Sequence, residues 1–285
     1  MKTRFLFSSP EGDLPAGDTT LARPFLINPS ETHPFMSLTD YFGGIETFIL
    51  CRDGGPLTRV LERAWKRAVA LEEIDEIRIR SEKHGALYHL ASVEVAAAGS
   101  RAKFSVSTAL QKTNKETLAR EFHTLRYLDE TYGLPYLPKV HLMEEVVCHC
   151  KNGAETLRMA LAEWFEGFHE WHLSRDKDNR LFIVIWDLEK GYRKASEKEA
   201  FAIYREASRI LTLYYNPETF AQICPWHHGA GDFVVRTSGE AIDVRATTAR
   251  GYGPWMIFHQ EEDLNPLVAV IYFFLNLSVK MRLDK

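Results

Sequence analysis

The chain has 285 residues, of which 45 % are hydrophobic and 26 % are charged, a composition typical of globular proteins and not of disordered or fibrous ones. Its formal net charge of -4 argues against a nucleic-acid binder that works through many phosphate contacts. Four scattered cysteines are too few for a disulfide scaffold and indicate a reducing compartment, so we expect a cytoplasmic protein.

The hydropathy pattern predicts no membrane segment. The first residues, MKTRFLFSSPEGDLPAG, lack the apolar core of a signal peptide. The longest apolar run, PLVAVIYFFLNLSV at 266–279, is too short to span a bilayer and predicts a buried helix. We therefore expect a soluble protein with neither a membrane nor a nucleic acid as its partner.

The N-terminal part of the chain predicts an arm followed by a helix. The first 35 residues are rich in Pro, Ser, Thr and Gly without sustained periodicity, so we expect an extended or partly ordered arm over 1–45. After a Gly-Gly-Pro breaker at 54–56, apolar residues recur at helical spacing and predict an amphipathic helix. Its apolar residues are Leu57, Val60, Leu61, Ala64, Trp65, Ala68 and Leu71.

The next segment predicts a small sheet interrupted by one helix. Residues 75–110 contain three stretches in which apolar and polar residues alternate, and these predict an antiparallel meander. Leu118, Phe122, Leu125 and Leu128 then have helical spacing, with Asn114 as the expected cap and Gly133 at the end. Two more strands are expected in LPYLPKVHLMEEVVCHC and ETLRMALAEWFEG.

The C-terminal part predicts helices around one hairpin. Ser196 and Glu199 form a capping box for a helix that starts near residue 196. The stretch CPWHHGAGDFVVRTSGEAIDVR, residues 224–245, then contains the hairpin DFVVR, TSGE, AIDVR, and the last fifty residues are expected to be mostly helical. With a boundary near Glu166 and Gly167, these elements predict an N-lobe over 46–166 and a helical C-lobe over 167–285.

This order of elements, together with the hairpin stretch, resembles the protein-kinase-like superfamily, and within it the aminoglycoside phosphotransferase and choline kinase branch. The resemblance covers roughly residues 75 to 260. It implies an α+β, two-lobe, kinase-like fold, in which a small antiparallel sheet with one helix precedes a mainly helical lobe. It also implies that ATP and Mg²⁺ are bound and that a phosphoryl group passes to a small-molecule or protein hydroxyl.

The resemblance assigns two residues of the sheet and its helix to phosphate binding. Gly85 in EKHGALYHL matches the turn whose backbone covers the nucleotide phosphates, although an isolated Gly at a hairpin is more often only a turn former. Glu121 in REFHTLRYL matches the helix glutamate that pairs with a strand lysine, although it is also typical of a solvated helix face. Ser107 stands near the expected lysine position, so Lys103 or Lys112 would have to substitute.

The segment LAEWFEG matches the linker that receives an adenine ring in the resembling families. Glu163 and Phe165 are the candidate contacts to the nucleotide base. The aromatic residues of this segment are equally typical of core packing. Of the two interpretations, we favour core packing.

In the hairpin, the resemblance implies a metal site and a base. Asp232 matches an Asn position and Asp243 matches a second Asp, and these two residues are the expected Mg²⁺ ligands. His227 and His228 occupy the place of the catalytic aspartate, where a neutral imidazole can act as general base.

Two arginines complete the set of candidate site residues. Arg245 and Arg250 follow the hairpin and are candidates for binding a phosphorylated or carboxylate substrate, although solvated surface arginines are equally common. Since the lysine and the catalytic aspartate both differ from the family, a pseudokinase that acts as a regulatory or interaction module is a strong alternative. A further alternative is a metal-dependent hydrolase that uses the His and Asp residues, and the simplest is an ordinary polar hairpin.

Overall fold

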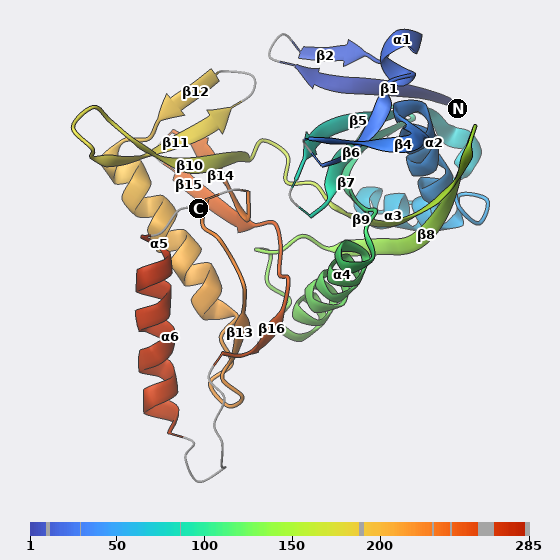
Figure 1. Ribbon diagram of the computed structural model, residues 1–285. Helices are drawn as coiled ribbons and strands as arrows, with labels where there is room; N and C mark the ends of the chain where they lie inside the picture. Colours follow the sequence, from blue (N-terminus) through green and yellow to red (C-terminus); the bar gives the residue numbers. More distant parts are fainter. Residues whose placement is uncertain are drawn as a thin grey trace. The chain divides into compact units, whose positions relative to one another are not determined.

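The structure is a computed structural model, and it describes residues 1–9, 12–28, 30–85, 87–187, 191–229, 231–239, 241–255 and 265–282. These residues form an α+β fold of strands and helices (Figure 1). The chain divides into two compact units. Unit 1 contains Met1–Phe122 and Lys139–Trp164, and unit 2 contains His123–Pro138 and Phe165–Lys285.

Unit 1 is built on a seven-stranded sheet with the order β2-β1-β5-β6-β7-β9-β8. β1 is parallel to β5, and the other neighbouring strands are antiparallel. The predicted succession of three strands, one helix and two strands is therefore present as β5, β6, β7, α4, β8 and β9. The bounds are β1 (Lys2–Ser9), β2 (Gly12–Pro15), β5 (Ile74–His84), β6 (His89–Ala97), β7 (Ser100–Ala109), β8 (Val140–Cys150), β9 (Gly153–Glu163) and α4 (Lys112–Tyr132), whose residues from His123 onward belong to unit 2.

The apolar face of this sheet forms the core of unit 1. Alternation along β5 and β6 places Ile77, Ile79, Val93 and Val95 on one face, and all four are fully buried. The helices α2 and α3 contribute to the same core. The remaining elements of unit 1 are α1 (Asp18–Leu21), β3 (Pro24–Asn28), β4 (Glu31–Ser37), α2 (Leu38–Ile49), α3 (Gly55–Trp65) and the short 3-10 helix η1 (Leu71–Glu73).

The N-terminal segment 1–45 is part of unit 1 and does not form the expected arm. β1 pairs with β5 along six residues, and the Phe5 ring stacks on the Phe42 ring with centroids 5.0 Å apart. Leu6 and Phe42 are buried. The Pro and Gly content of this segment reflects its turns, while the short stretch RFLF supplies the apolar side chains of a strand.

Unit 2 contains a second sheet, so the expectation of a mainly helical lobe is wrong. The sheet has five strands in the order β12-β11-β10-β14-β15, and β13 and β16 form a separate pair. Three strands between residues 169 and 194 were not anticipated from the sequence. The bounds are β10 (His169–Arg175), β11 (Leu181–Asp187), β12 (Gly191–Lys194), α5 (Glu197–Leu213), β13 (Ala221–Ile223), β14 (Phe233–Ser238), β15 (Ala241–Ala246), β16 (Tyr252–Pro254) and α6 (Pro266–Lys280).

The predicted hairpin is confirmed as β14 and β15, which pair from Phe233 opposite Ala246 to Ser238 opposite Ala241. Glu240 of the predicted turn lies outside the described residues. Of the last fifty residues, which were expected to be mostly helical, the described part contains the end of β14, the strands β15 and β16, and one helix, α6.

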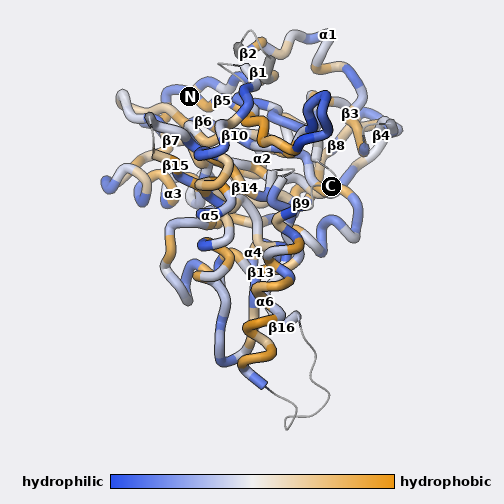
Figure 2. The backbone as a smooth tube through the Cα atoms, turned by 90° about the vertical axis from the view of Figure 1, so that its left-hand side faces the viewer, coloured by the Kyte–Doolittle hydropathy of each residue, from blue (hydrophilic) through white to orange (hydrophobic). Residues whose placement is uncertain are grey.

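α6 is a helix, as predicted, but it is buried on one side only. Ala269, Phe273 and Leu277 are buried, and the Phe273 ring lies 4.4 Å from the Tyr215 ring. Much of the helix is apolar, as the orange tube of Figure 2 shows. No helix in the described part of the chain is both long and apolar enough to cross a bilayer. The exposed large side chains, which are between 39 % and 67 % exposed, are Leu267, Val268, Ile271, Tyr272, Phe274, Leu275 and Val279.

The capping box at the start of α5 is confirmed and gives a pH prediction. Glu199 accepts hydrogen bonds from Arg193 and from the backbone of Ser196, and these contacts lower the pKa of Glu199 from 4.5 to about 2. A lowered pKa in the folded state contributes stability that is full above the unfolded pKa and is lost as the pH falls through about 2. We expect Glu199→Gln to lower the melting temperature at about pH 6. Between about pH 4.5 and pH 2, the melting temperature of this variant should fall less than that of the unchanged protein. Melting curves of both proteins across this range test the expectation, and parallel curves would contradict it.

Candidate functional site

The candidate site is formed by loop 224–232, between β13 and β14, and segment 247–251, between β15 and β16. Within unit 2 they are joined by hydrogen bonds to backbone carbonyls as well as by side-chain contacts. The Cys224 amide donates to the Gly251 carbonyl (3.0 Å), and the Thr247 amide donates to the Asp232 carbonyl (2.8 Å). The Thr247 hydroxyl donates to the Gly231 carbonyl (2.6 Å). The two segments are therefore fixed against each other at one end of the hairpin.

Asp232 is the centre of this arrangement. Its Oδ1 accepts a hydrogen bond from Arg250 Nη2 (2.6 Å), and its Oδ2 accepts from Arg250 Nη1 (2.7 Å) and from the His227 amide (2.8 Å). The Asp232 side chain is only 4 % exposed, and that of Arg250 is 22 % exposed. A guanidinium that binds both carboxylate oxygens neutralises the carboxylate and fixes its orientation. Asp232 therefore acts as the structural partner of Arg250 and of the loop backbone.

The two histidines of the loop have different environments. His228 is fully buried, and its ring meets the Tyr204 ring edge to face at 5.5 Å. His227 is exposed, and its backbone is fixed by the Asp232 carboxylate. Of the two predicted bases, only His227 is placed to meet a substrate from solvent.

Asp243 is not beside Asp232. It lies opposite Arg236 within the hairpin, and Arg236 Nη2 is 3.0 Å from its Oδ2, while Arg245 pairs with its Oδ1. β15 continues to Ala246, and the residue that meets Asp232 across the hairpin is Thr247. Asp243 precedes Thr247 by four residues, or about 13 Å along a strand.

The structure therefore does not bring together the two expected Mg²⁺ ligands. One Mg²⁺ ion contacts its ligands at about 2.1 Å, so carboxylates separated by most of a strand length cannot share it. Among the residues that the structure describes, no group of three or more His, Cys, Asp or Glu side chains is placed to hold a metal ion. The two aspartates have different partners and different roles.

The two arginines proposed for substrate binding both have carboxylate partners within unit 2. Arg250 binds Asp232, and Arg245 binds Asp243. The Arg245 guanidinium also lies 5.4 Å from the ring centroids of Tyr136 and Phe168. These contacts order both arginines, which is not expected of solvated surface side chains.

The expected phosphate-binding residues Gly85 and Glu121 belong to unit 1. The Gly85 amide donates to the Tyr88 carbonyl (2.9 Å), so this glycine closes the turn that leads into β6. Glu121 is buried on α4, next to Phe122, which packs with Leu118 against the sheet. The helix glutamate is thus not a solvated surface residue.

The expected adenine contacts are at the end of β9 and just beyond it. The Glu163 amide donates to the Lys139 carbonyl (2.8 Å), and Glu163 Oε2 accepts from the Lys139 amide (3.3 Å). The Phe165 ring, which begins the second segment of unit 2, lies 5.7 Å from the Phe168 ring. Phe165 and Phe168 are half-buried, so the two rings pack on each other without belonging to the fully buried core.

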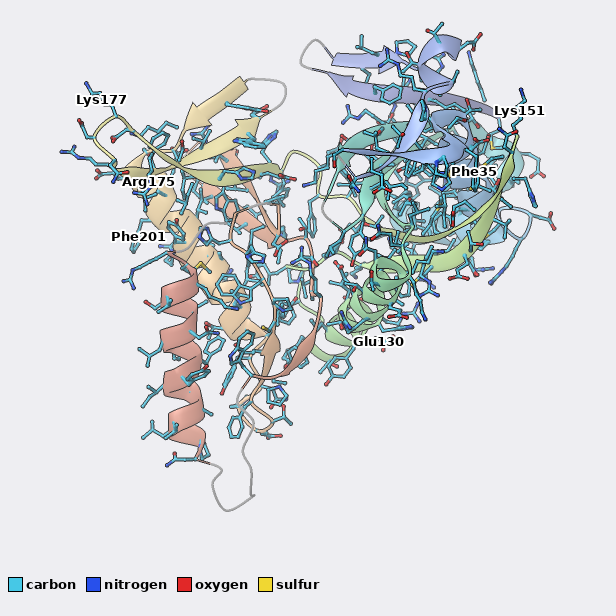
Figure 3. The ribbon with its side chains drawn as sticks, in the orientation of Figure 1. Phe35, Glu130, Lys151, Arg175, Lys177 and Phe201 are labelled. Carbon is cyan, nitrogen blue, oxygen red and sulfur yellow. The ribbon has the colours of Figure 1, made fainter. Side chains whose placement is uncertain are left out.

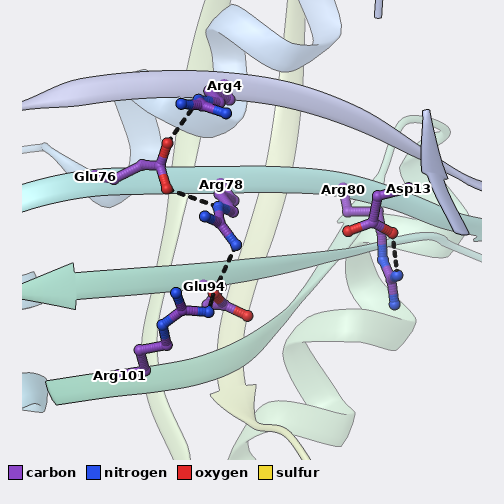
Figure 4. A network of polar contacts seen from close by, with 7 residues as sticks. All are labelled: Arg4, Asp13, Glu76, Arg78, Arg80, Glu94 and Arg101. Carbon is purple, nitrogen blue, oxygen red and sulfur yellow. Dashed lines mark hydrogen bonds and ion pairs between the residues drawn. The ribbon is translucent and has the colours of Figure 1, made fainter. Parts of the chain in front are cut away.

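The polar face of the unit 1 sheet carries a network of ion pairs, shown in Figure 4. Glu76 on β5 contacts Arg4 (2.6 Å) and Arg78 (2.7 Å), and Glu94 on β6 contacts Arg78 (3.3 Å) and Arg101 (3.2 Å). Exposed ion pairs contribute about 0 to 1 kcal/mol each. These pairs are partly exposed, whereas the Asp232 side chain in its pair with Arg250 is only 4 % exposed.

The close contact of the two site segments gives a second prediction. A Cβ atom on Gly251 would lie 2.7 Å from the Cys224 carbonyl oxygen, whereas one on Gly253 would meet nothing within 4 Å. We expect Gly251→Ala to destabilise unit 2 by about 1 to 3 kcal/mol, because backbone must move to relieve the overlap. Gly253→Ala is the matched control and should change the free energy of unfolding by less than about 0.5 kcal/mol. Equal effects in urea denaturation would contradict this account of the loop.

Thr247 is the site residue that the sequence did not reveal. The hairpin pattern placed Asp243 at the end of the far strand because no register was known. The signal that points to Thr247 is the length of AIDVRA, which continues the alternation of apolar and polar residues beyond Asp243. No protein-family model matches this chain, and a search of curated proteins finds no significant relative.

Proposed function

We propose that the chain has a kinase-like, two-lobe fold and acts as a non-catalytic binding module, that is, a pseudokinase. The order β5, β6, β7, α4, β8, β9 followed by the hairpin β14–β15 supports the fold, because the resemblance rests on this order. The pairing of Asp232 with Arg250 supports the loss of catalysis and is the observation that carries the proposal.

Phosphoryl transfer needs metal ligands, but Asp232, the candidate ligand of the hairpin, is bound to Arg250 instead. Mg²⁺ neutralises charge on the transferred phosphoryl group and is held by oxygen ligands, usually carboxylates. Binding Mg²⁺ at Asp232 would break the two hydrogen bonds between this carboxylate and the Arg250 guanidinium, and breaking a largely buried ion pair costs several kcal/mol. The neighbouring position across the hairpin holds Thr247, whose neutral hydroxyl is a weak substitute for a second carboxylate.

The nucleotide side of the proposal depends on unit 1. Gly85, Glu121 and Glu163 are the candidate contacts to ATP, and Ser107 stands where a phosphate-binding lysine is expected. Lys103, the nearest substitute, lies 4.4 Å from the Trp164 ring centroid and 3.9 Å from Glu82 Oε1. The proposal assigns no role to Mg²⁺, and it replaces phosphoryl transfer with recognition of a protein partner.

The hydrolase alternative has less support. A His and Asp metal site in this hairpin would need Asp232, His227 and His228 as ligands, but Asp232 is neutralised by Arg250 and His228 is fully buried beside Tyr204. Adjacent residues of an extended segment also point in opposite directions. The geometry therefore favours the pseudokinase.

Turnover tests the proposal. Purified protein is incubated with ATP labelled at the γ-phosphate, Mg²⁺ or Mn²⁺, and a library of hydroxyl acceptors, and label transfer is measured. We expect no transfer above the level of protein with His227→Ala. Transfer that is lost in both His227→Ala and Asp232→Ala but retained in Asp243→Ala would overturn the proposal and identify an active transferase.

A further inference from the structure

Unit 2 contains a cavity between the strands β10 and β11 and the helices α5 and α6. Its volume is about 880 Å³, within the range of about 300 to 1,000 Å³ that is typical of small-molecule sites. Its inner wall is apolar, since Ile183, Leu277 and Met281 line it and are themselves buried. Leu173 and Tyr204 extend this wall. The cavity is therefore suited to an apolar group.

Three arginines line the same cavity: Arg205 and Arg209, which are four residues apart on α5, and Arg282, which follows α6. Residues with this spacing lie on the same face of a helix. All three are exposed. The cavity thus combines an apolar wall with guanidinium groups that reach solvent.

The arginines of the cavity exceed the acidic groups that pair with them. Arg209 Nε is 2.8 Å from Glu206, and Arg209 Nη2 donates to the Tyr136 hydroxyl (2.8 Å). Arg205 Nη2 is 3.1 Å from the Glu206 carboxylate. Arg282 Nη1 donates to the Ser278 hydroxyl (3.2 Å). Among the described residues, Glu206 is the one acidic group in ion pairs with this set, so three positive charges face one negative charge. Such an excess attracts an anion to the cavity.

We propose that this cavity binds a single-chain amphiphile with an anionic head, such as a long-chain carboxylate or an alkyl phosphate. The apolar chain lies against Ile183, Leu277 and Met281, and the head meets the guanidinium of Arg282 together with those of Arg205 and Arg209. An uncharged apolar ligand would form no ion pair with the arginines. A small hydrophilic anion would leave the apolar wall exposed to water. The inference is independent of the proposed function, since it uses no residue of loop 224–232.

Isothermal calorimetry with dodecanoate tests the proposal. Each buried methylene contributes a constant increment, so extending the chain from decanoate to dodecanoate should tighten binding roughly tenfold. Dodecanoate and dodecyl phosphate should both bind more tightly than dodecanol, because guanidinium groups bind carboxylate and phosphate alike. Dodecyltrimethylammonium should bind more weakly than dodecanol. No heat with dodecanoate, or equal affinity for dodecanoate and dodecanol, would overturn the proposal.

Variants locate the site. Arg282→Ala should weaken the binding of dodecanoate about fivefold to tenfold and leave the binding of dodecanol unchanged. Arg63→Ala on α3 is the matched control and should change the affinity for neither ligand. Ser208→Trp, which fills the cavity from α5, should abolish the binding of both ligands, and Ser278→Trp fills it from α6 in case the first variant does not fold. Unchanged binding in a folded filling variant would overturn the location. Binding to anionic phospholipid vesicles with no binding of dodecanoate would indicate a membrane surface instead and would also overturn it.

Discussion

Replacing Arg250 with alanine is expected to destabilise unit 2 by about 3 to 5 kcal/mol. The change leaves the Asp232 carboxylate, which is 4 % exposed, as a buried charge without its guanidinium partner. The His227 amide still donates to this carboxylate, but one hydrogen bond does not compensate for the lost ion pair. Urea denaturation, followed by the fluorescence of the buried Trp171 and Trp226, measures the loss.

Two controls separate this effect from general damage. Arg250→Ala combined with Asp232→Asn removes the buried charge and should recover part of the lost stability, since the two side chains are coupled. Arg236→Ala breaks the pair with Asp243, a carboxylate that is 33 % exposed, and should cost no more than about 1 kcal/mol. Equal losses in Arg250→Ala and Arg236→Ala would contradict the distinction between the two aspartates.

Replacing Phe42 with alanine is expected to destabilise unit 1 by about 3 to 5 kcal/mol. Phe42 is fully buried on α2, and its ring meets those of Phe5 (5.0 Å) and Phe7 (5.6 Å) from β1. Truncation of a buried phenylalanine removes apolar contacts and leaves a cavity. Urea denaturation followed by the fluorescence of Trp65, which lies at the end of α3 and packs against the core of unit 1, reports the loss and tests whether the N-terminal segment belongs to that core.

Phe201 on α5 is the matched control for Phe42. Its side chain is 69 % exposed, and Figure 3 shows it at the outside of the helix. Phe201→Ala should change the free energy of unfolding by less than about 0.5 kcal/mol. A small effect of Phe42→Ala would mean that β1 and α2 form a loosely attached arm after all.

The sequence predicted the elements in which a regular side-chain pattern continues over many residues. β5, β6 and β7 were anticipated because buried and charged residues alternate along them, and α5 was anticipated from Ser196 and Glu199. β10 and β11 were missed although LFIVIWD is rich in β-branched residues, because the expected helical lobe took precedence over the local pattern. The N-terminal strands were missed because Pro and Gly were weighted above the apolar stretch RFLF.

The candidate site was only partly predictable. The residues of the hairpin, including Asp232 and Arg250, were singled out from their types and spacing. Their pairing was not, because the distance between loop 224–232 and segment 247–251 depends on the register of β14 and β15 and on the pairing of β13 with β16. A hairpin register is set by the turn and by cross-strand packing, neither of which can be read reliably from a single sequence. Asp243 was assigned to the metal for this reason, and Thr247 was overlooked.

Water-proton relaxation with Mn²⁺ and ATP tests the central claim most directly, that this hairpin holds no metal. Mn²⁺ accepts the same oxygen ligands as Mg²⁺, and a metal–nucleotide complex held by a protein relaxes water protons more strongly than the free complex does. We predict that the relaxation rate of Mn²⁺ and ATP with the protein is the same as with Asp232→Ala, because Asp232 is bound to Arg250 and holds no metal. An enhanced rate that Asp232→Ala abolishes and Asp243→Ala preserves would contradict the account.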